Sequence, residues 1–291
     1  MKKIKRILTN KVLIYISDKN LIKLIYIYKL KRFLNLKNPK TLNEKIQWLK
    51  LYDRTDLHTL CADKLKVRQY IKELIGEKYL IPLVFSTKNV EDIKLGNLPD
   101  YPIIIKTNHD SGTFFIIKDK VKQDWKSIRK ELKKALLSNY YYASREWQYK
   151  NIEPFIIVEK LLLTDDKKVP MDLKLHCFNG KVEFIQVDIN RETNHCRSFF
   201  NIDWELLNFG LGYPRGQKVL KPENLSLLVS LAEKISSKFY LSRIDFYELK
   251  GMVFFGEITL HHGSGYEQFS PKEKDLEYGN LLKLPVNKFS I

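Results

Sequence analysis

Residues 242–259 read SRIDFYELKGMVFFGEIT, and this stretch decides the fold class of the 291-residue chain. Two apolar, aromatic-rich runs flank Lys250 and Gly251, where glycine supplies the turn, so the stretch predicts a β-hairpin. Side chains two positions apart on a strand share one face. One face of the first strand therefore carries both Arg243 and Asp245.

Two carboxylates come together when this hairpin folds. Glu257 and Thr259 share a face of the second strand, and the hairpin brings Glu257 near Asp245. Close carboxylates repel unless a proton or cation lies between them, and carboxylate oxygens are ligands that Mg²⁺ favours. The pair therefore indicates a magnesium site. The alternative is two charges on a solvated face of the hairpin.

The composition indicates a globular protein with an uneven charge. Hydrophobic residues make up 44% and aromatic residues 12% of the chain. Three cysteines without zinc-like spacing argue against a disulfide framework and favour a reduced, cytoplasmic setting. The net charge is +17, and residues 1–40 hold twelve Lys or Arg against one acid, Asp18. This segment thus carries +11 and the other 251 residues only +6.

The basic N-terminal segment has two interpretations. Residues 3–34 predict two short helices broken at 17–20, with Ile, Leu and Tyr among the lysines. No apolar run reaches the roughly 18 residues that a membrane span needs, and no signal-peptide cleavage pattern is present. Such helices can lie on an anionic membrane surface or bind a polyanion. The alternative is a helical cap with a solvated basic face.

A second hairpin carries a candidate phosphate loop. Residues 103–106 form a buried-type strand that ends at Lys106, and residues 114–118 form its partner. The small polar residues 107–113 between them would let backbone N–H groups approach a phosphate, with Lys106 as a point charge. A plain hairpin turn is the alternative, because the loop has one glycine and no Walker sequence.

Other polar residues are further candidates for a binding site, and the alternative for the two arginines among them is a solvated surface. Asp172, Lys174 and His176 alternate onto one face of a strand that ends at an Asn-Gly turn. Arg191 and Arg197 flank a loop that could bind an anion. The remaining pattern predicts helices at 42–52, from 63 and at 222–239, and a helix followed by an aromatic loop within 124–149. It also predicts strands at 79–85 and 155–162, and a polar connection at 53–60.

In this order the elements resemble the ATP-grasp superfamily, specifically its TupA-like branch, related to teichuronopeptide biosynthesis. Residues 42–50 (LNEKIQWLK), 145–151 (REWQYKN) and 177–182 (CFNGKV) carry the likeness to that branch, and the resemblance covers about residues 41–285. It implies an α+β ATP-grasp fold in which two α+β subdomains with largely antiparallel sheets hold ATP between them. The corresponding division is a basic helical segment 1–40, a helical and strand region 41–95, a small subdomain 96–165 and a C-terminal subdomain 166–291.

The resemblance also implies roles for individual residues. It identifies Lys64 and Lys106 as phosphate-binding lysines, and Asp245, Glu257 and Thr259 as magnesium ligands, Thr259 standing where relatives commonly have asparagine. The further nucleotide-binding positions are His109, Ser111, Gly112, Thr113, Glu159, Lys160, Leu162, Asp172 and Lys174. The catalytic candidates are Arg243 and Lys174 at the reacting phosphoryl group, and Arg191 and Arg197 at the acceptor carboxylate.

The function implied is an ATP- and Mg²⁺-dependent carboxylate–amine ligase that works through an acyl phosphate. The expected substrates are a uronic acid of a capsular or cell-surface polysaccharide and an amino acid or other amine. Two alternatives remain: a glycosyltransferase of the same pathway, and a non-catalytic basic module that binds a polyanion or a membrane. No nucleic-acid motif is present, so no nucleic-acid partner is expected. The expected location is the cytoplasm, with peripheral contact at the inner membrane face.

Overall fold

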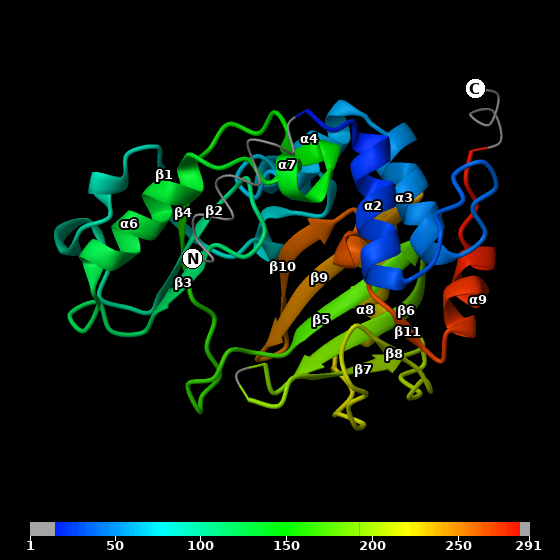
Figure 1. Ribbon diagram of the computed structural model, residues 1–291. Helices are drawn as coiled ribbons and strands as arrows, with labels where there is room; N and C mark the ends of the chain where they lie inside the picture. Colours follow the sequence, from blue (N-terminus) through cyan, green and yellow to red (C-terminus); the bar gives the residue numbers. More distant parts are fainter. Residues whose placement is uncertain (1–14, 192, 286–291) are drawn as a thin grey trace.

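The computed structural model describes residues 15–191 and 193–285, which form two antiparallel sheets side by side (Figure 1). The four-stranded sheet has the order β1 (Leu83–Thr87), β4 (Ile156–Lys160), β2 (Ile103–Thr107) and β3 (Phe114–Ile117). The five-stranded sheet has the order β10 (Met252–Thr259), β9 (Leu241–Leu249), β5 (Asp172–Phe178), β6 (Lys181–Ile189) and β7 (Cys196–Phe200). A short pair joins β8 (Gly210–Leu211) to β11 (Phe269–Ser270).

Helices lie outside these sheets. The α-helices of the described part are α2 (Asp18–Leu30), α3 (Leu42–Tyr52), α4 (Asp56–Ala62), α5 (Val67–Leu74), α6 (Trp125–Leu136), α7 (Tyr141–Ser144), α8 (Leu225–Ser236) and α9 (Glu273–Leu281). Within the described residues, none is long and apolar enough to cross a membrane.

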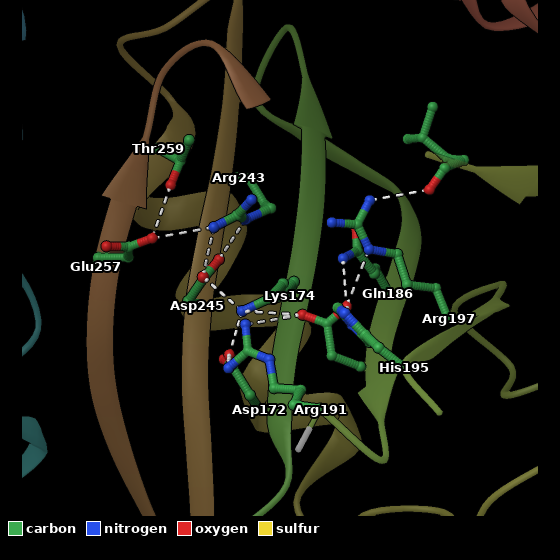
Figure 2. A network of polar contacts seen from close by, with 12 residues as sticks. Asp172, Lys174, Gln186, Arg191, His195, Arg197, Arg243, Asp245, Glu257 and Thr259 are labelled. Carbon is green, nitrogen blue, oxygen red and sulfur yellow. Dashed lines mark hydrogen bonds and ion pairs between the residues drawn. The ribbon is translucent and has the colours of Figure 1, made fainter. Parts of the chain in front are cut away.

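Each sheet has its own apolar core. On β2 the side chains of Ile103 and Ile105 are buried and pack with Leu132 of α6, which covers the small sheet. The large sheet is covered by α5 and α8 on one face, where Ile71 and Ile235 join the core. The other face is partly covered by α3, α9 and a cluster of aromatic residues. The remaining part of that face carries polar side chains and looks toward the small sheet (Figures 1 and 2).

The α3–α5 region shows where local pattern predicts the fold. Helix α3 has the expected bounds, and it begins with a capping box between Thr41 and Glu44. The polar connection expected at 53–60 is wrong, because α4 begins at Asp56 and buries Cys61. The helix expected from residue 63 starts at Val67 instead. The Asp63 carboxylate accepts the backbone N–H groups of Leu65 and Lys66 at 2.9 and 3.2 Å, so this segment is a turn.

Helix α2 confirms the second of the two short helices expected within residues 3–34; the first lies outside the described residues. Tyr26 and Ile22 are buried against the body of the protein. Asp18 pairs with Arg54 at 2.8 Å, and Arg32 pairs with Asp275. This helix is therefore an integral cap of the large subdomain. The division into four segments stays a prediction; β1, from the expected 41–95 region, pairs with β4 of the small sheet.

Candidate functional site

A cavity of about 390 Å³ lies between the two sheets. Residues from both sheets and from the segment after β4 line it. The positions singled out by sequence that line this cavity are Lys64, Lys106, Ser111, Gly112, Thr113, Glu159, Lys160, Leu162, Asp172, Lys174, Arg191, Arg243, Asp245 and Glu257. The fold thus brings together residues that are up to 193 positions apart, from Lys64 to Glu257.

The β9–β10 hairpin places its two carboxylates on one face by means of a bulge. Lys250 and Gly251 have φ of 52° and 72°, the left-handed values of a tight hairpin turn. Strict pairing from this turn would set Glu257 opposite Ile244, whose side chain is in the core. The register shifts between Phe255 and Glu257, so Glu257 lies opposite Asp245 instead.

Glycine suits the residue that makes this bulge. A Cβ at position 256 would lie 3.0 Å from the carbonyl oxygen of Asp245 and 3.2 Å from the ring of Tyr247. The side chain of any other residue would therefore press on the strand that carries Asp245. An isolated glycine in a strand pattern is a typical signal of a bulge.

Arg243 lies between the two carboxylates (Figure 2). Its guanidinium donates to both oxygens of Asp245 at 2.7 Å and to Glu257 Oε1 at 3.0 Å. Lys174 Nζ donates to Asp245 Oδ2 at 3.0 Å and also bonds Asp172. The buried negative charge is therefore balanced within the protein.

The two carboxylates differ in their electrostatics. Burial raises the pKa of Glu257, but the positive charges of Arg243, Lys64 and Lys174 outweigh it and lower that pKa to about 2. Burial raises the pKa of Asp245, and Arg243 and Lys174 oppose this effect. Glu257 is therefore ionised at neutral pH, and its side chain is 40% exposed at the cavity.

The donor set fits Mg²⁺ held together with phosphate. The described residues contain no group of three or more His, Cys, Asp or Glu arranged to hold a metal ion by themselves. Asp245 and Glu257 offer hard oxygens at the cavity wall. Mg²⁺ is usually bound by one or two carboxylates, with water and substrate phosphates completing its shell. The pair is therefore suited to an ion that arrives with a nucleotide.

Two of the expected ligand-binding residues lie away from the cavity. Thr259 does not line it; its hydroxyl donates to Glu257 Oε1 at 3.0 Å and so orients that carboxylate. His109 is buried, and its ring nitrogens lie 3.2 Å from Asn108 Oδ1 and 3.1 Å from the carbonyl oxygen of Ala135. The expectation for His109 is corrected, because its ring ties the loop to the end of α6 rather than facing a ligand.

Two lysines reach the cavity from opposite sides of the small-residue loop. Lys64 Nζ donates to the carbonyl oxygen of Asp110, and burial together with the nearby charge of Lys106 lowers the pKa of Lys64. Lys106 Nζ lies 2.6 Å from Glu159 Oε2, and Arg68 donates to the other oxygen of Glu159 at 2.9 Å. Glu159 thus holds Lys106 in place at the cavity wall.

The loop that follows Lys106 is shaped by Asp110, a residue that sequence reasoning passed over. Its carboxylate accepts the hydroxyls of Thr107 at 2.6 Å and Thr113 at 2.5 Å. Gly112 has φ of 104°, which only glycine adopts readily. The Thr-x-x-Asp-x-x-Thr spacing could have signalled such a pinned loop.

Asp188 is the second residue that sequence reasoning missed. Its side chain, 1% exposed near the end of β6, attracts Arg197 Nε at 3.0 Å, Arg191 Nη2 at 3.0 Å and Lys174 Nζ at 3.8 Å. Burial raises the pKa of Asp188, but these three charges lower it to about 2. Gln186 and Asp188 continue the alternation of the preceding strand, which is the signal that could have placed Asp188 on the polar face.

Asp188 separates the two arginines expected at the acceptor. Arg191 lines the cavity with its side chain 53% exposed. Arg197 does not line it and is 12% exposed, because it also donates to Glu267 at 2.8 Å and to the carbonyl oxygen of Leu211 at 2.9 Å. Figure 2 shows Arg197 beside His195, away from Arg243 and Glu257. The expectation for Arg197 is corrected, because its guanidinium N–H groups donate to acceptors within the protein.

A family model described as TupA-like ATP-grasp matches residues 44–283. The chain belongs to the TupA-like ATP-grasp family. Family membership confirms the ATP-grasp, α+β fold expected from the sequence, and the two antiparallel sheets around the cavity agree with it. No curated protein matches the chain.

Solved structures of ATP-grasp proteins resemble this TupA-like chain at low identity. D-alanine–D-alanine ligase from Bacillus anthracis is 18% identical over 77% of this chain and 65% of its own, with a TM-score of 0.45. The Helicobacter pylori enzyme is 17% identical over 85% and 70%, with a TM-score of 0.41. A RimK-domain ATP-grasp protein from Sphaerobacter thermophilus is 10% identical over 78% and 67%, with a TM-score of 0.46. This chain thus spans under two thirds of the Bacillus anthracis ligase.

Asp188 should stabilise the TupA-like chain through its charge. We expect Asp188→Asn to lower the free energy of unfolding at pH 7 by about 2 kcal/mol, because the charged acceptor of the two arginines is lost. Since the folded pKa lies near 2, below the unfolded value of about 3.9, this stabilisation is complete above pH 4 and disappears as pH falls toward 2. Urea denaturation at pH 7 and pH 3, with exposed Asp203→Asn as control, measures it. Equal losses at the two pH values would contradict the charge argument.

Proposed function

We propose that this chain is an ATP-dependent carboxylate–amine ligase that forms an amide through an acyl phosphate. The observation that carries the proposal is the cavity between the sheets, where Asp245, Glu257 and Arg243 face Lys64 and Lys106. Two carboxylates for a metal and three cations for phosphate are the groups that phosphoryl transfer requires. Membership of the ATP-grasp family supports the same activity.

The opposite end of the cavity suits the adenine base. Ile104, Ile116 and Leu162 supply apolar lining there. At the end of β4, the N–H groups of Lys160 and Leu161 donate to carbonyl oxygens of neighbouring segments at 2.9 and 3.0 Å. These bonds hold the segment extended so that its next residues lie against a flat base. ATP would therefore lie with its base at this segment and its phosphates at the lysines.

In the proposed reaction an acceptor carboxylate oxygen attacks the γ-phosphorus, and ADP leaves. The amine nitrogen then attacks the acyl carbon, phosphate leaves, and the amine loses a proton. Lys64 and Lys106 hold the phosphate charges, and Arg243 sets both metal-binding carboxylates while its charge faces the reacting group. Asp245 and Glu257 would hold Mg²⁺, and the bound ion would neutralise charge on the phosphates.

The decisive assay traps the acyl phosphate. With ATP, Mg²⁺ and galacturonate, hydroxylamine should give a hydroxamate in step with ADP formation. ADP formation without a hydroxamate from any carboxylate offered would contradict the ligase proposal. A glycosyltransferase would instead consume a nucleotide sugar and leave ATP intact.

We further propose that the acceptor is a uronic acid of a capsular or cell-surface polysaccharide and the donor an amino acid or other amine. The likeness to the teichuronopeptide branch supports this choice. Arg191 supports it as well, because it presents a half-exposed guanidinium at the cavity and arginine suits bidentate contact with a carboxylate. The protein would work in the cytoplasm, where ATP is available.

The described N-terminal helix supports peripheral contact with the inner membrane face. Opposite its buried side, α2 exposes Leu24, Ile27 and Tyr28, the last 71% exposed, and Phe33 beyond it is 85% exposed. Lysines surround these apolar side chains, and Lys31 Nζ lies 4.9 Å from the centre of the Tyr28 ring. Basic residues around exposed apolar ones are typical of helices that bind anionic lipid.

Lys106 offers a test of nucleotide binding that should leave the fold intact. We expect Lys106→Met to weaken the affinity for an ATP analogue with Mg²⁺ about tenfold, because one charge-assisted contact to phosphate is lost. Glu159 keeps its bond to Arg68, so no buried carboxylate is left alone. Isothermal titration measures the affinity, with Lys118→Met, which lies outside the cavity, as control. Unchanged affinity would make the β2–β3 hairpin purely structural.

A further inference from the structure

A second hollow, of about 660 Å³, lies at the β7 edge of the large sheet. Residues 189, 190 and 194–196 form one wall, and residues 214–217 form the other. Residues 214–217 lie along β7, since Arg197 N donates to Pro214 O at 2.9 Å and Gly216 N donates to Arg197 O at 2.7 Å. A Cβ at position 216 would lie 2.6 Å from Ser198 Oγ, so only glycine lets this wall pack so closely. One wall of the hollow, called the edge groove below, is therefore held along β7 by backbone hydrogen bonds.

Most side chains of the edge groove are polar, and none of its described lining residues is acidic. Its lining residues are Ile189, Asn190, Asn194, His195, Cys196, Pro214, Arg215, Gly216 and Gln217. The amide groups of Asn190, Asn194 and Gln217 are exposed and make no hydrogen bond to another described side chain or backbone group. Amides of this kind donate to and accept from hydroxyl groups. Arg215 adds a positive charge without a carboxylate partner among the described residues.

An exposed aromatic side chain, that of Tyr213, lies beside the edge groove. The exposed ring of Tyr213 lies 4.0 Å from the His195 ring and 4.4 Å from the guanidinium carbon of Arg197, measured between centres. Arg197 is itself fixed by Asp188 and Glu267, so the ring is held in place. Aromatic faces pack against the C–H faces of sugars, while polar groups around them bond the hydroxyls.

The edge groove and the nucleotide cavity are lined by neighbouring residues of the chain. Asn190 lines the groove, and the next residue, Arg191, lines the cavity. Asp188 contacts residues on both sides, Arg191 toward the cavity and His195 toward the groove at 3.2 Å. Asp188 and the Asn190–Arg191 pair thus tie the groove to the part of the cavity where Arg191 lies.

We propose that the edge groove is the subsite for the neighbouring sugars of an acidic oligosaccharide acceptor, with Arg215 on a carboxylate, the three amides on hydroxyls and Tyr213 against a sugar face. This inference rests on the proposed function, because it takes the acceptor of that reaction to be a glycan. The proposal assigns recognition of the acceptor's length and charge to residues at the β7 edge of the sheet. Strand β6 separates this edge from the strands that line the ATP site.

The test uses the full-length protein and galacturonic acid trimer, with galactose trimer as the neutral probe. Without nucleotide, titration calorimetry should show the acidic trimer binding at least tenfold more tightly than the neutral one. Arg215→Gln should weaken binding of the acidic trimer about tenfold, and Asn194→Ala several-fold. Lys221→Gln removes one exposed charge outside the groove and should change nothing. ATP-analogue affinity should be unchanged in all three variants.

The possible outcomes test the groove proposal and the ligase proposal separately. Equal affinity for both trimers, no binding of the acidic trimer at millimolar concentration, or full affinity in Arg215→Gln and Asn194→Ala overturns the groove proposal. Binding that depends on these residues, without any ADP formation on addition of the trimer and an amine, retains the groove and overturns the ligase acceptor. Stimulated ADP formation that the groove variants do not alter retains the ligase and overturns the groove.

Discussion

Replacing Asp245 with asparagine or Glu257 with glutamine is expected to lower ADP formation by roughly 100-fold or more. Each change removes one of the two carboxylates that the β9–β10 hairpin presents to the cavity for a metal, at the position where charge must be neutralised during phosphoryl transfer. Arg243 keeps one carboxylate partner in either variant, since it bonds both. The fold should therefore survive while the reaction does not.

The same variants should show that the loss concerns metal binding. We expect the Mg²⁺ concentration for half-maximal ADP formation to rise, and Mn²⁺ bound in the presence of ADP, followed by its spin-resonance signal, to fall. Glu183→Gln is the control, because Glu183 belongs to the same sheet but lies outside the cavity. Near-normal turnover of either cavity variant would remove Asp245 and Glu257 from the metal site.

The register of this hairpin shows how far sequence reasoning reaches. Alternation correctly placed Arg243 with Asp245 and Glu257 with Thr259. The two pairs share a face only because the second strand contains one extra residue, which forms a bulge. In a hairpin without this bulge, the side chain of Glu257 would lie on the face opposite Asp245. Gly256 supplied that residue, and an isolated glycine was a readable sign of it. The local pattern thus predicted the two strands, and the bulge determines that Asp245 and Glu257 lie on the same face.

The remaining misses have a tertiary cause. Arg197 and Glu267 are 70 positions apart, and nothing local indicates that Arg197 spends its donors on Glu267 and on buried Asp188. His109 belongs to a loop of small residues, and its orientation depends on the end of α6. An exposed and a buried arginine look alike in sequence. Their roles became distinct only when the packed neighbours were known.

Removing charge from α2 is the other change with a large expected effect. We expect Lys19, Lys23 and Lys31, all changed to glutamine, to weaken binding to vesicles rich in anionic lipid by about 3 kcal/mol, or roughly 100-fold. All three side chains are exposed, so the fold should be unaffected. Deleting residues 1–35 would be a poor test, because it removes buried Tyr26 and the Arg32–Asp275 pair.

The control must have the same charge change on another face. Lys126, Lys130 and Lys133 are exposed on α6, and changing them to glutamine should leave vesicle binding unchanged. A second variant, Leu24→Ser with Tyr28→Ser, separates the apolar contribution from the charge and should also weaken binding. Binding of the unchanged protein should fall as salt rises, since exposed charges are screened within about 10 Å at 0.1 M. Because α2 lies outside the cavity, ADP formation on soluble substrate should be equal in every variant. If the α2 and α6 variants lose binding equally, only net charge attracts the protein, and α2 is a cap whose exposed apolar face has no lipid partner.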